Sequence, residues 1–222
     1  MIEKRFSKGE AVKFGWSMVK NNLIFFVGLF IADGLIYQAL EIISKSTKEN
    51  IPVLSFASDI VYLFIQIIVQ MGLIKISLRI CDNMKCELAD FFSDLLSCLP
   101  LFFKYLLGTI LYLLIVLSGI ILLIIPGVIW SVKYSFFGYF IIDKGLGPIE
   151  ALKESSLITK GAKQDLFLFW VLISAVNFLG VLAFFIGLFV TIPITVVAIG
   201  FVYRKLLNKT GAAQTTVLLI GP

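Results

Sequence analysis

The chain has 222 residues, of which 59% are hydrophobic and 15% charged, and its mean hydropathy is +1.02. Soluble domains carry about 25% charged residues, so a soluble fold could not bury this much apolar surface. The composition therefore predicts a single membrane domain that lipid solvates in part. The net charge is +5 and histidine is absent, which removes the commonest general base and metal ligand.

The first predicted element is an amphipathic helix at residues 7–20. Ser7 can cap its start, and Glu10 three residues later fits a capping box. One polar stripe is formed by Glu10, Lys13, Ser17 and Lys20. Apolar residues lie opposite this stripe, which is typical of a helix that lies in the membrane interface.

Six apolar segments are predicted to cross the membrane, because about 20 helical residues span the hydrocarbon core. They are residues 23–43, 54–78, 101–125, 128–143, 166–186 and 188–206. A polar loop is predicted at residues 44–50, and a turn at Ile125-Pro126-Gly127. Pro193 predicts a kink in the last span, and residues 208–222 are predicted to be a loosely ordered tail.

Two further polar helices are predicted, at residues 80–98 and 148–163, and each precedes two spans. The segment Glu10-Ala11-Val12-Lys13 closely resembles Glu150-Ala151-Leu152-Lys153, and a hairpin turn falls at a similar distance after Glu87 and Glu150. The spacing predicts an all-α membrane domain, residues 1–207, built from three parallel copies of an interfacial helix plus a hairpin. These copies are residues 7–80, 84–143 and 147–207.

The basic residues gather on one side of the predicted spans. Of 19 Lys and Arg residues, only Lys45 and Lys48 fall on the opposite side, and Lys133 falls within a span. The positive-inside rule predicts a plasma (inner) membrane protein with both termini in the cytoplasm. Three cytoplasmic interfacial helices would then meet anionic headgroups, so the net charge indicates membrane lipids as partners and not nucleic acid. The sequence makes no prediction of oligomeric state.

Asp33 and Lys133 are predicted to lie at the same depth, near the middle of the membrane. Each lies about 15 Å along a helix from the cytoplasmic end of its span. A lone charge at this depth costs about 3 kcal/mol or more, so the two residues are expected to pair, directly or through Gln66, Gln70 or Asn177. This cluster is either a structural lock between two spans or part of a proton or substrate relay.

Several short motifs in the second half have a recognisable order. They are Ile125-Pro126-Gly127-Val128-Ile129, Lys133-Tyr134-Ser135, Tyr139 to Asp143, Glu150 to Ser155, Lys160-Gly161, Phe167-Leu168 and Tyr203-Arg204. In this order, residues 120–207 resemble an uncharacterised prokaryotic membrane family that includes the YciC-type proteins and the membrane domain of some glycerophosphodiester phosphodiesterases. Lys133 stands where that family has arginine, and Lys144-Gly145 where it has Asn-Pro. The resemblance implies a multi-pass fold without enzyme activity, because the phosphodiesterase chemistry belongs to a soluble barrel domain that this sequence does not contain.

The residues themselves also give no catalytic constellation. The sequence lacks a GxSxG, an HExxH and a phosphate-binding P-loop. Cys81, Cys86 and Cys98 are odd in number and are expected to be apolar thiols, so no metal, disulfide or cofactor is predicted. Asp143 with Glu150 and Glu154 could form an acid pair, although acidic residues are also typical of a helix start.

Two functions remain as predictions. The first is a non-enzymatic membrane protein of envelope or lipid homeostasis, because three interfacial helices accompany the hairpins. The second is a transporter or channel for ions or small solutes that uses Asp33 and Lys133.

Overall fold

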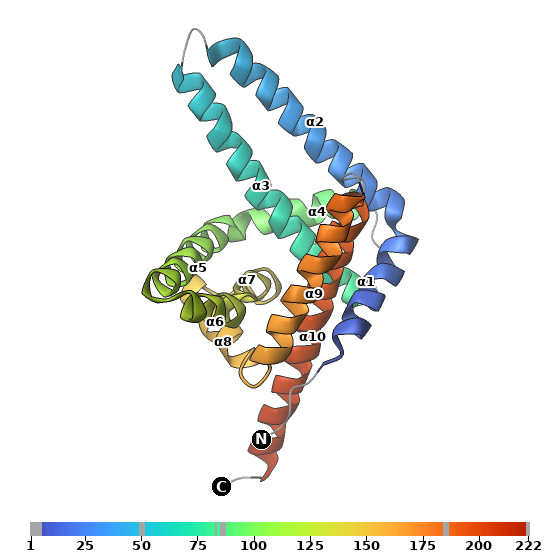
Figure 1. The fold of residues 1–222 in the computed structure, drawn as a ribbon, viewed down its shortest axis with the longest axis vertical. Helices are drawn as coiled ribbons and strands as arrows, with labels where there is room; N and C mark the ends of the chain where they lie inside the picture. The colour runs from blue at the N-terminus through green and yellow to red at the C-terminus, as the bar shows by residue number, and fades with distance from the viewer. Residues whose placement is uncertain (1–5, 49–51, 83, 85–87, 184–186, 221–222) are drawn as a thin grey trace.

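The computed structural model describes all of the chain except residues 1–5, 49–51, 83, 85–87, 184–186 and 221–222. The regular structure in this described part is helical, which confirms the all-α prediction (Figure 1). The helices are α1 (Lys8–Asn21), α2 (Leu23–Lys48), α3 (Pro52–Cys81), α4 (Leu88–Cys98), α5 (Phe102–Leu122), α6 (Ile124–Tyr134), α7 (Phe137–Lys144), α8 (Pro148–Ile158), α9 (Lys163–Leu182) and α10 (Leu188–Ile220).

Five segments in the described part of the chain are long and apolar enough to cross a membrane. They are Asp59–Cys81, Ser93–Leu122, Ile124–Lys144, Lys163–Leu182 and Leu188–Gly211. A sixth candidate joins α1 to the first part of α2, up to Ala39. These two helices meet at 81°, which is the geometry of a broken span or a re-entrant loop. These helices indicate a multi-pass membrane protein with five candidate spans, or six if the bent pair forms one span.

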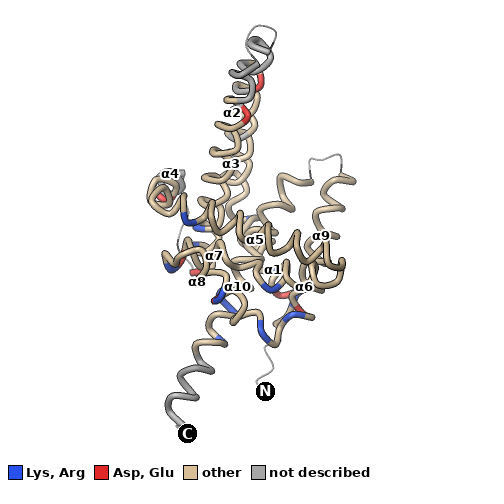
Figure 2. The backbone as a smooth tube through the Cα atoms, turned by 90° about the vertical axis from the view of Figure 1, so that its left-hand side faces the viewer, with Lys and Arg blue, Asp and Glu red and all other residues tan. Residues whose placement is uncertain are grey.

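The helical hairpins point in different directions. In Figure 1, α2 and α3 are seen from the side at the top, whereas α5 and α6 are seen nearly end-on at the left. α9 and α10 run side by side on the right, with α1 along their outer edge. Figure 2 shows most Lys and Arg residues in the lower part of the molecule, below the α2–α3 hairpin. The basic residues thus share one end of the bundle, while the side of the membrane that this end faces stays a prediction.

The predicted first helix is confirmed, and it packs on the last one. The backbone N–H of Glu10 donates to Ser7 Oγ (3.3 Å), so Ser7 caps α1 as predicted. Lys205 Nζ donates to Glu10 Oε2 (2.6 Å), and Gly15 lies against the backbone of Ile194. Residue numbers fall along α10 as they rise along α1, so the two helices are antiparallel. Packing against a spanning helix was not predicted for this interfacial segment.

The turn between α5 and α6 lies three residues before the predicted one. Leu123 alone is extended (φ −170°, ψ 145°), whereas Pro126-Gly127 lies in the first turn of α6. Proline is tolerated there because its missing N–H would have no helical partner. Gly119 and Gly127 bring the two helices into close contact, since a Cβ on Gly127 would lie 2.5 Å from Ile120 Cγ1.

Two further element boundaries differ from the predictions, whereas the last hairpin turns near Gly187 as predicted. The α9–α10 hairpin is also closed by a glycine pair, because a Cβ on Gly187 would lie 2.7 Å from Gly180 Cα. The predicted loop 44–50 is wrong in its first part, since α2 continues to Lys48, and residues 49–51 lie outside the described part. The predicted loosely ordered tail at residues 208–222 is helical in its described part, because α10 continues to Ile220. Pro193 lies inside this helix. The three-fold repeat itself stays a prediction.

The fourth predicted span is interrupted between α6 and α7, and α8 supplies hydrogen bonds at the break. Ser155 Oγ accepts from the backbone N–H of Phe136 (3.1 Å) and donates to the carbonyl of Lys133 (3.1 Å). Thr159 Oγ1 donates to the same carbonyl (3.1 Å). Both hydroxyl-bearing residues are fully buried. Backbone groups that the helix cannot pair are thereby satisfied inside the bundle, as membrane depth requires.

The second and third polar helices were predicted to lie in the membrane interface, but both also pack against other helices of the protein. α8 buries one face against α5, α6 and α7. α4 leads through a short 3-10 turn (Leu99–Leu101) into α5, and the candidate span begins within α4. Asp94 of α4 is only 7% exposed, and it pairs with Arg79 (2.9 Å) and Lys75 (3.5 Å) of α3. Asp94 of α4 thus pairs with two basic residues near the end of a candidate spanning helix.

Replacing Ser155 by alanine tests the bonds at the break. We expect Ser155→Ala to lower the free energy of unfolding by about 1–3 kcal/mol, because a buried N–H loses its acceptor and a carbonyl loses one of its donors. The measurement is unfolding of the detergent-solubilised protein by a denaturing detergent. Ser156→Ala, one position along α8, is the control and should change stability by less than about 0.5 kcal/mol. Equal effects of the two variants would contradict this role of Ser155.

Candidate functional site

The structure leaves the predicted Asp33–Lys133 pair untested. Asp33 lies in α2, but its side chain is outside the described residues. Lys133 is half-buried in α6, where its Nζ donates to Tyr134 Oη (3.0 Å) and lies 4.8 Å from the centroid of that ring. The extensive neighbours of α2 are α3 and α10, whereas those of α6 are α5, α8 and α9. The pairing therefore stays a prediction, and Tyr134 is a contact of Lys133 that it did not include.

The three predicted amide residues lie at different helix contacts. Asn177 Nδ2 donates to Thr195 Oγ1 (3.1 Å) and so joins α9 to α10. Gln70 Oε1 accepts from Tyr105 Oη (3.4 Å) and joins α3 to α5. Gln66 lies one turn before Gln70 and is half-buried. Among the predicted site residues with described side chains, Gln70 is the one that lines the cleft considered next.

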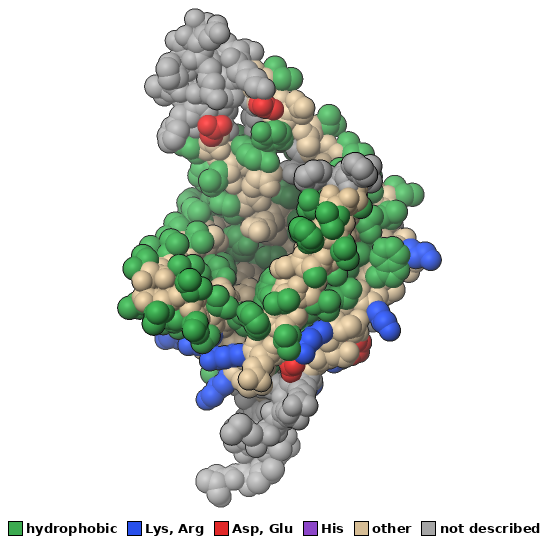
Figure 3. All heavy atoms as spheres, viewed as in Figure 1, with side chains coloured by type: hydrophobic (Ala, Val, Ile, Leu, Met, Phe, Trp, Pro, Cys, Tyr) green, Lys and Arg blue, Asp and Glu red, His purple; other side chains and the backbone are tan. Residues whose placement is uncertain are grey.

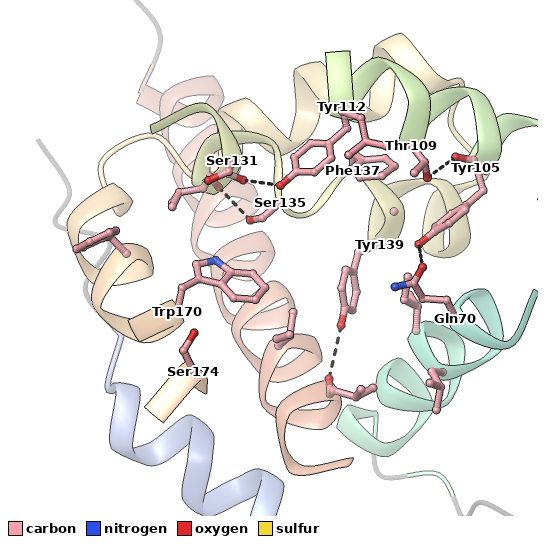
Figure 4. Close-up of a pocket in the computed structure, with 18 of the residues that line it drawn as sticks. Gln70, Tyr105, Thr109, Tyr112, Ser131, Ser135, Phe137, Tyr139, Trp170 and Ser174 are labelled. Atoms are coloured by element: carbon pink, nitrogen blue, oxygen red, sulfur yellow. Dashed lines mark hydrogen bonds between the residues drawn. The ribbon is translucent and has the colours of Figure 1, made fainter. Parts of the chain in front are cut away.

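A cleft of about 850 Å³ lies between α3, α5, α6, α7, α9 and α10. Figure 3 shows the surface hollowed near its centre, between the hairpins. Most of the lining is aliphatic or aromatic, and no charged side chain of the described residues takes part. The polar members are Gln70, Tyr105, Thr109, Tyr112, Ser131, Ser135, Tyr139 and Ser174 (Figure 4). The cleft is therefore neutral and largely apolar, with hydroxyl groups spaced along its walls.

Helical spacing brings these side chains to the cleft. On α5, Tyr105, Thr109 and Tyr112 follow one another at intervals of four and three residues and so share one face. α9 contributes Trp170 and Ser174 at the same kind of interval. A line of hydroxyls at helical spacing in an otherwise apolar span is visible in the sequence, and it is the signal by which the α5 wall could have been found.

Most of the hydroxyl protons in the cleft already have acceptors. Thr109 Oγ1 donates to the carbonyl of Tyr105 (2.9 Å), and Ser135 Oγ to that of Val132 (2.9 Å). The three phenol contacts are longer: Tyr112 Oη to the carbonyl of Ser131 at 3.3 Å, Tyr105 Oη to Gln70 at 3.4 Å, and Tyr139 Oη to the carbonyl of Val196 at 3.5 Å. Phenol hydrogen bonds are usually about 2.7–2.8 Å, so these bonds are long. The buried Tyr139 also has a side-chain hydrogen bond with Ser77.

An ion network joins the ends of α3 and α7 to the middle of α10. Both carboxylate oxygens of Asp143 accept from Arg204 Nη1 (3.0 Å each), and Oδ2 also accepts from Tyr203 Oη (2.9 Å). Arg204 Nη2 donates to Asp82 at the end of α3 (2.7 Å). Tyr203 is fully buried, and Asp143 keeps 12% of its side chain exposed. The partners of Asp143 are thus Arg204, Tyr203 and, at 3.6 Å, the neighbouring Lys144, which makes the network a structural clamp.

One of the acidic residues proposed as a pair with Asp143 lies at a helix start. Glu150 Oε2 accepts from the backbone N–H of Gly147 (3.2 Å), so Glu150 takes part in capping α8. This confirms the helix-start interpretation for Glu150. Within the described residues, no group of three or more His, Cys, Asp or Glu side chains is close enough to hold a metal ion.

Comparison with protein-family models, with curated proteins and with solved structures found no match. The resemblance of residues 120–207 to the YciC-type family therefore gains no support from them and stays a prediction. Several of the residues on which the resemblance is based form hydrogen bonds with one another. The carbonyl of Lys133 accepts from Ser155, and Asp143 accepts from Tyr203 and Arg204.

Proposed function

We propose that this chain is a non-enzymatic membrane protein that holds a lipid acyl chain in the central cleft and acts in envelope or lipid homeostasis. The observation that carries the proposal is a neutral, largely apolar cleft between hairpins that are themselves apolar enough to span a membrane. Its volume falls within the range of about 300–1,000 Å³ that is usual for ligand pockets. In a bilayer, the molecules at hand to fill such a space are lipid chains.

The proposed setting is the plasma membrane, with the basic end of the bundle and both termini in the cytoplasm. The one-sided distribution of Lys and Arg in Figure 2 supports this orientation. Transport of ions or small solutes through Asp33 and Lys133 is the second candidate. The absence of charged side chains among the described residues of the cleft weighs against it, because an ion there would lose its hydration without a counter-charge.

Filling the cleft should displace the chain. Ser174 lines the cleft on α9, and we expect Ser174→Phe to reduce lipid that co-purifies with the protein at least about threefold, since its ring would occupy the chain's space. Mass spectrometry of the intact protein released from mild detergent measures this ratio. Ser118→Phe is the matched control, because Ser118 is an exposed serine of α5 that does not line the cleft.

Equal lipid retention in the two serine variants would overturn the proposal. A flux assay in liposomes distinguishes the second candidate function, transport, from lipid-chain binding. Solute or ion flux that Asp33→Asn abolishes and Ser174→Phe leaves unchanged would favour transport over chain binding.

A further inference from the structure

A lysine lies on the same face of α9 as the cleft residues. Lys163 is the first residue of α9, and Phe167, Trp170 and Ser174 follow it at intervals of four, three and four residues. Residues at these intervals share one helix face. Lys163 is exposed and lies one turn, about 6 Å, beyond Phe167 along the axis. The wall of the cleft thus continues toward a positive charge at its α9 end.

A second lysine strengthens the charge at this end. Lys160 is exposed and lies just before Gly161, which has a positive φ (87°) and turns the chain into α9. Neither Lys160 nor Lys163 has an acidic partner in the described part of the chain. The nearby carboxylate of Asp165 is already paired with Lys8 (2.9 Å). Lys160 and Lys163 line a separate surface pocket together with Lys8 and Asp165, so this end of α9 carries a net positive charge.

We infer that the occupant of the cleft is an anionic phospholipid, with an acyl chain along Trp170 and its phosphate beside Lys160 and Lys163. This inference rests on the proposed function and adds the class of lipid to it. A phospholipid combines an apolar chain with a phosphate at one end. The protein presents the apolar α9 wall of the cleft and two lysines at the end of that wall, which match these two parts.

The net charge of the headgroup determines whether Lys160 and Lys163 favour an anionic or a zwitterionic lipid. A zwitterionic headgroup brings a cation of its own close to the two lysines, whereas a phosphatidylglycerol headgroup brings a net negative charge. Two lysines near a membrane surface favour the anionic lipid on the order of tenfold. The exposed lysines of α1, Lys13 and Lys20, do not lie on the α9 wall of the central cleft and serve as the comparison.

Tryptophan fluorescence can measure which lipid enters the cleft. The chain has three tryptophans, so Trp16→Phe with Trp130→Phe leaves Trp170 as the single reporter in the cleft. The protein is reconstituted in phosphatidylcholine vesicles that contain an increasing mole fraction of one brominated lipid. This lipid is either phosphatidylglycerol or phosphatidylcholine, and its dibrominated chains quench tryptophan on contact. We expect the brominated phosphatidylglycerol to quench Trp170 with at least about threefold higher apparent affinity.

The lysine variants assign this preference to the α9 end of the cleft. Lys160→Gln with Lys163→Gln should abolish the preference for phosphatidylglycerol, whereas Lys163→Arg alone should retain it because the charge is kept. The matched control, Lys13→Gln with Lys20→Gln, removes the same number of charges from α1 and should leave the preference unchanged. Equal quenching by both brominated lipids, or a preference that survives the Lys160/Lys163 double change, would overturn the inference.

A second reporter separates failure of this inference from failure of the proposed function. Trp130 does not line the cleft, so a protein with Trp130 as its single tryptophan reports lipid around the bundle. If Trp170 is quenched more strongly than Trp130 but without headgroup preference, chain binding stands and the anionic inference falls. If Trp170 is quenched no more than Trp130 by either lipid, both fall.

Discussion

Gly127→Val is expected to lower the free energy of unfolding by about 3 kcal/mol, at the upper end of the usual cost of overpacking. A Cβ at this position would lie 2.5 Å from Ile120 Cγ1 and 2.8 Å from the backbone nitrogen of Ile120. The side chain could move, but the backbone cannot move without separating α5 from α6. The measurement is the unfolding transition of the protein in detergent, followed by circular dichroism.

The control for this change is Gly28→Val in α2. A Cβ on Gly28 would have no atom within 4 Å, so the same gain of volume in another apolar helix should change stability by less than about 1 kcal/mol. If the two variants lose similar free energy of unfolding, the loss comes from valine in a helix in general. The close contact of α5 with α6 would then not contribute measurably to stability.

Loss of the Asp143 carboxylate is expected to destabilise the bundle by about 3 kcal/mol. Asp143→Ala leaves the guanidinium of Arg204 half-buried with Asp82 as its acidic partner among the described residues, and it removes the acceptor of the buried Tyr203 hydroxyl. Removing one member of a well-paired buried ion pair is costly because the other charge stays desolvated. Unfolding in detergent at neutral pH measures the effect.

Asp82 supplies the comparison within the same network. Its side chain is 41% exposed, so water can replace part of its contact with Arg204, and Asp82→Ala should cost about 1 kcal/mol or less. A double change of Asp143→Leu with Arg204→Leu should recover part of the stability lost in Asp143→Ala, because no unpaired charge is left. An equal cost at Asp82 and Asp143, or no recovery in the double variant, would contradict the clamp.

The sequence predicted the features that depend on neighbours along the chain. Hydropathy and helical periodicity predicted the helices and five of the spans, and the pattern of Ser7 and Glu10 predicted the start of α1. The position of the α5–α6 turn could not be read in this way. Pro126-Gly127 is a common turn sequence, yet proline is equally suited to the first turn of a helix, and Leu123 carries no turn signal of its own.

The features that depend on the directions of whole helices could not be predicted from the sequence. The cleft exists because the hairpins diverge, and no residue pattern encodes that divergence directly. For the same reason, α8 was predicted to face headgroups, whereas Ser155 and Thr159 pair with the backbone at the α6–α7 break. A buried serine can be predicted there only when the broken helix it serves is known.

The packing of α1 on α10 sets an order for assembly in the membrane. The Glu10–Lys205 ion pair joins residues 195 positions apart, and at about 5–20 residues per second roughly 10–40 s separate their synthesis. During this time Ala11, Gly15 and Val19, which are all buried in the finished protein, have no α10 to pack against. The contact can form only in a chain inserted to its last span, so a protease or chaperone that recognises this face of α1 would distinguish incomplete chains from complete ones.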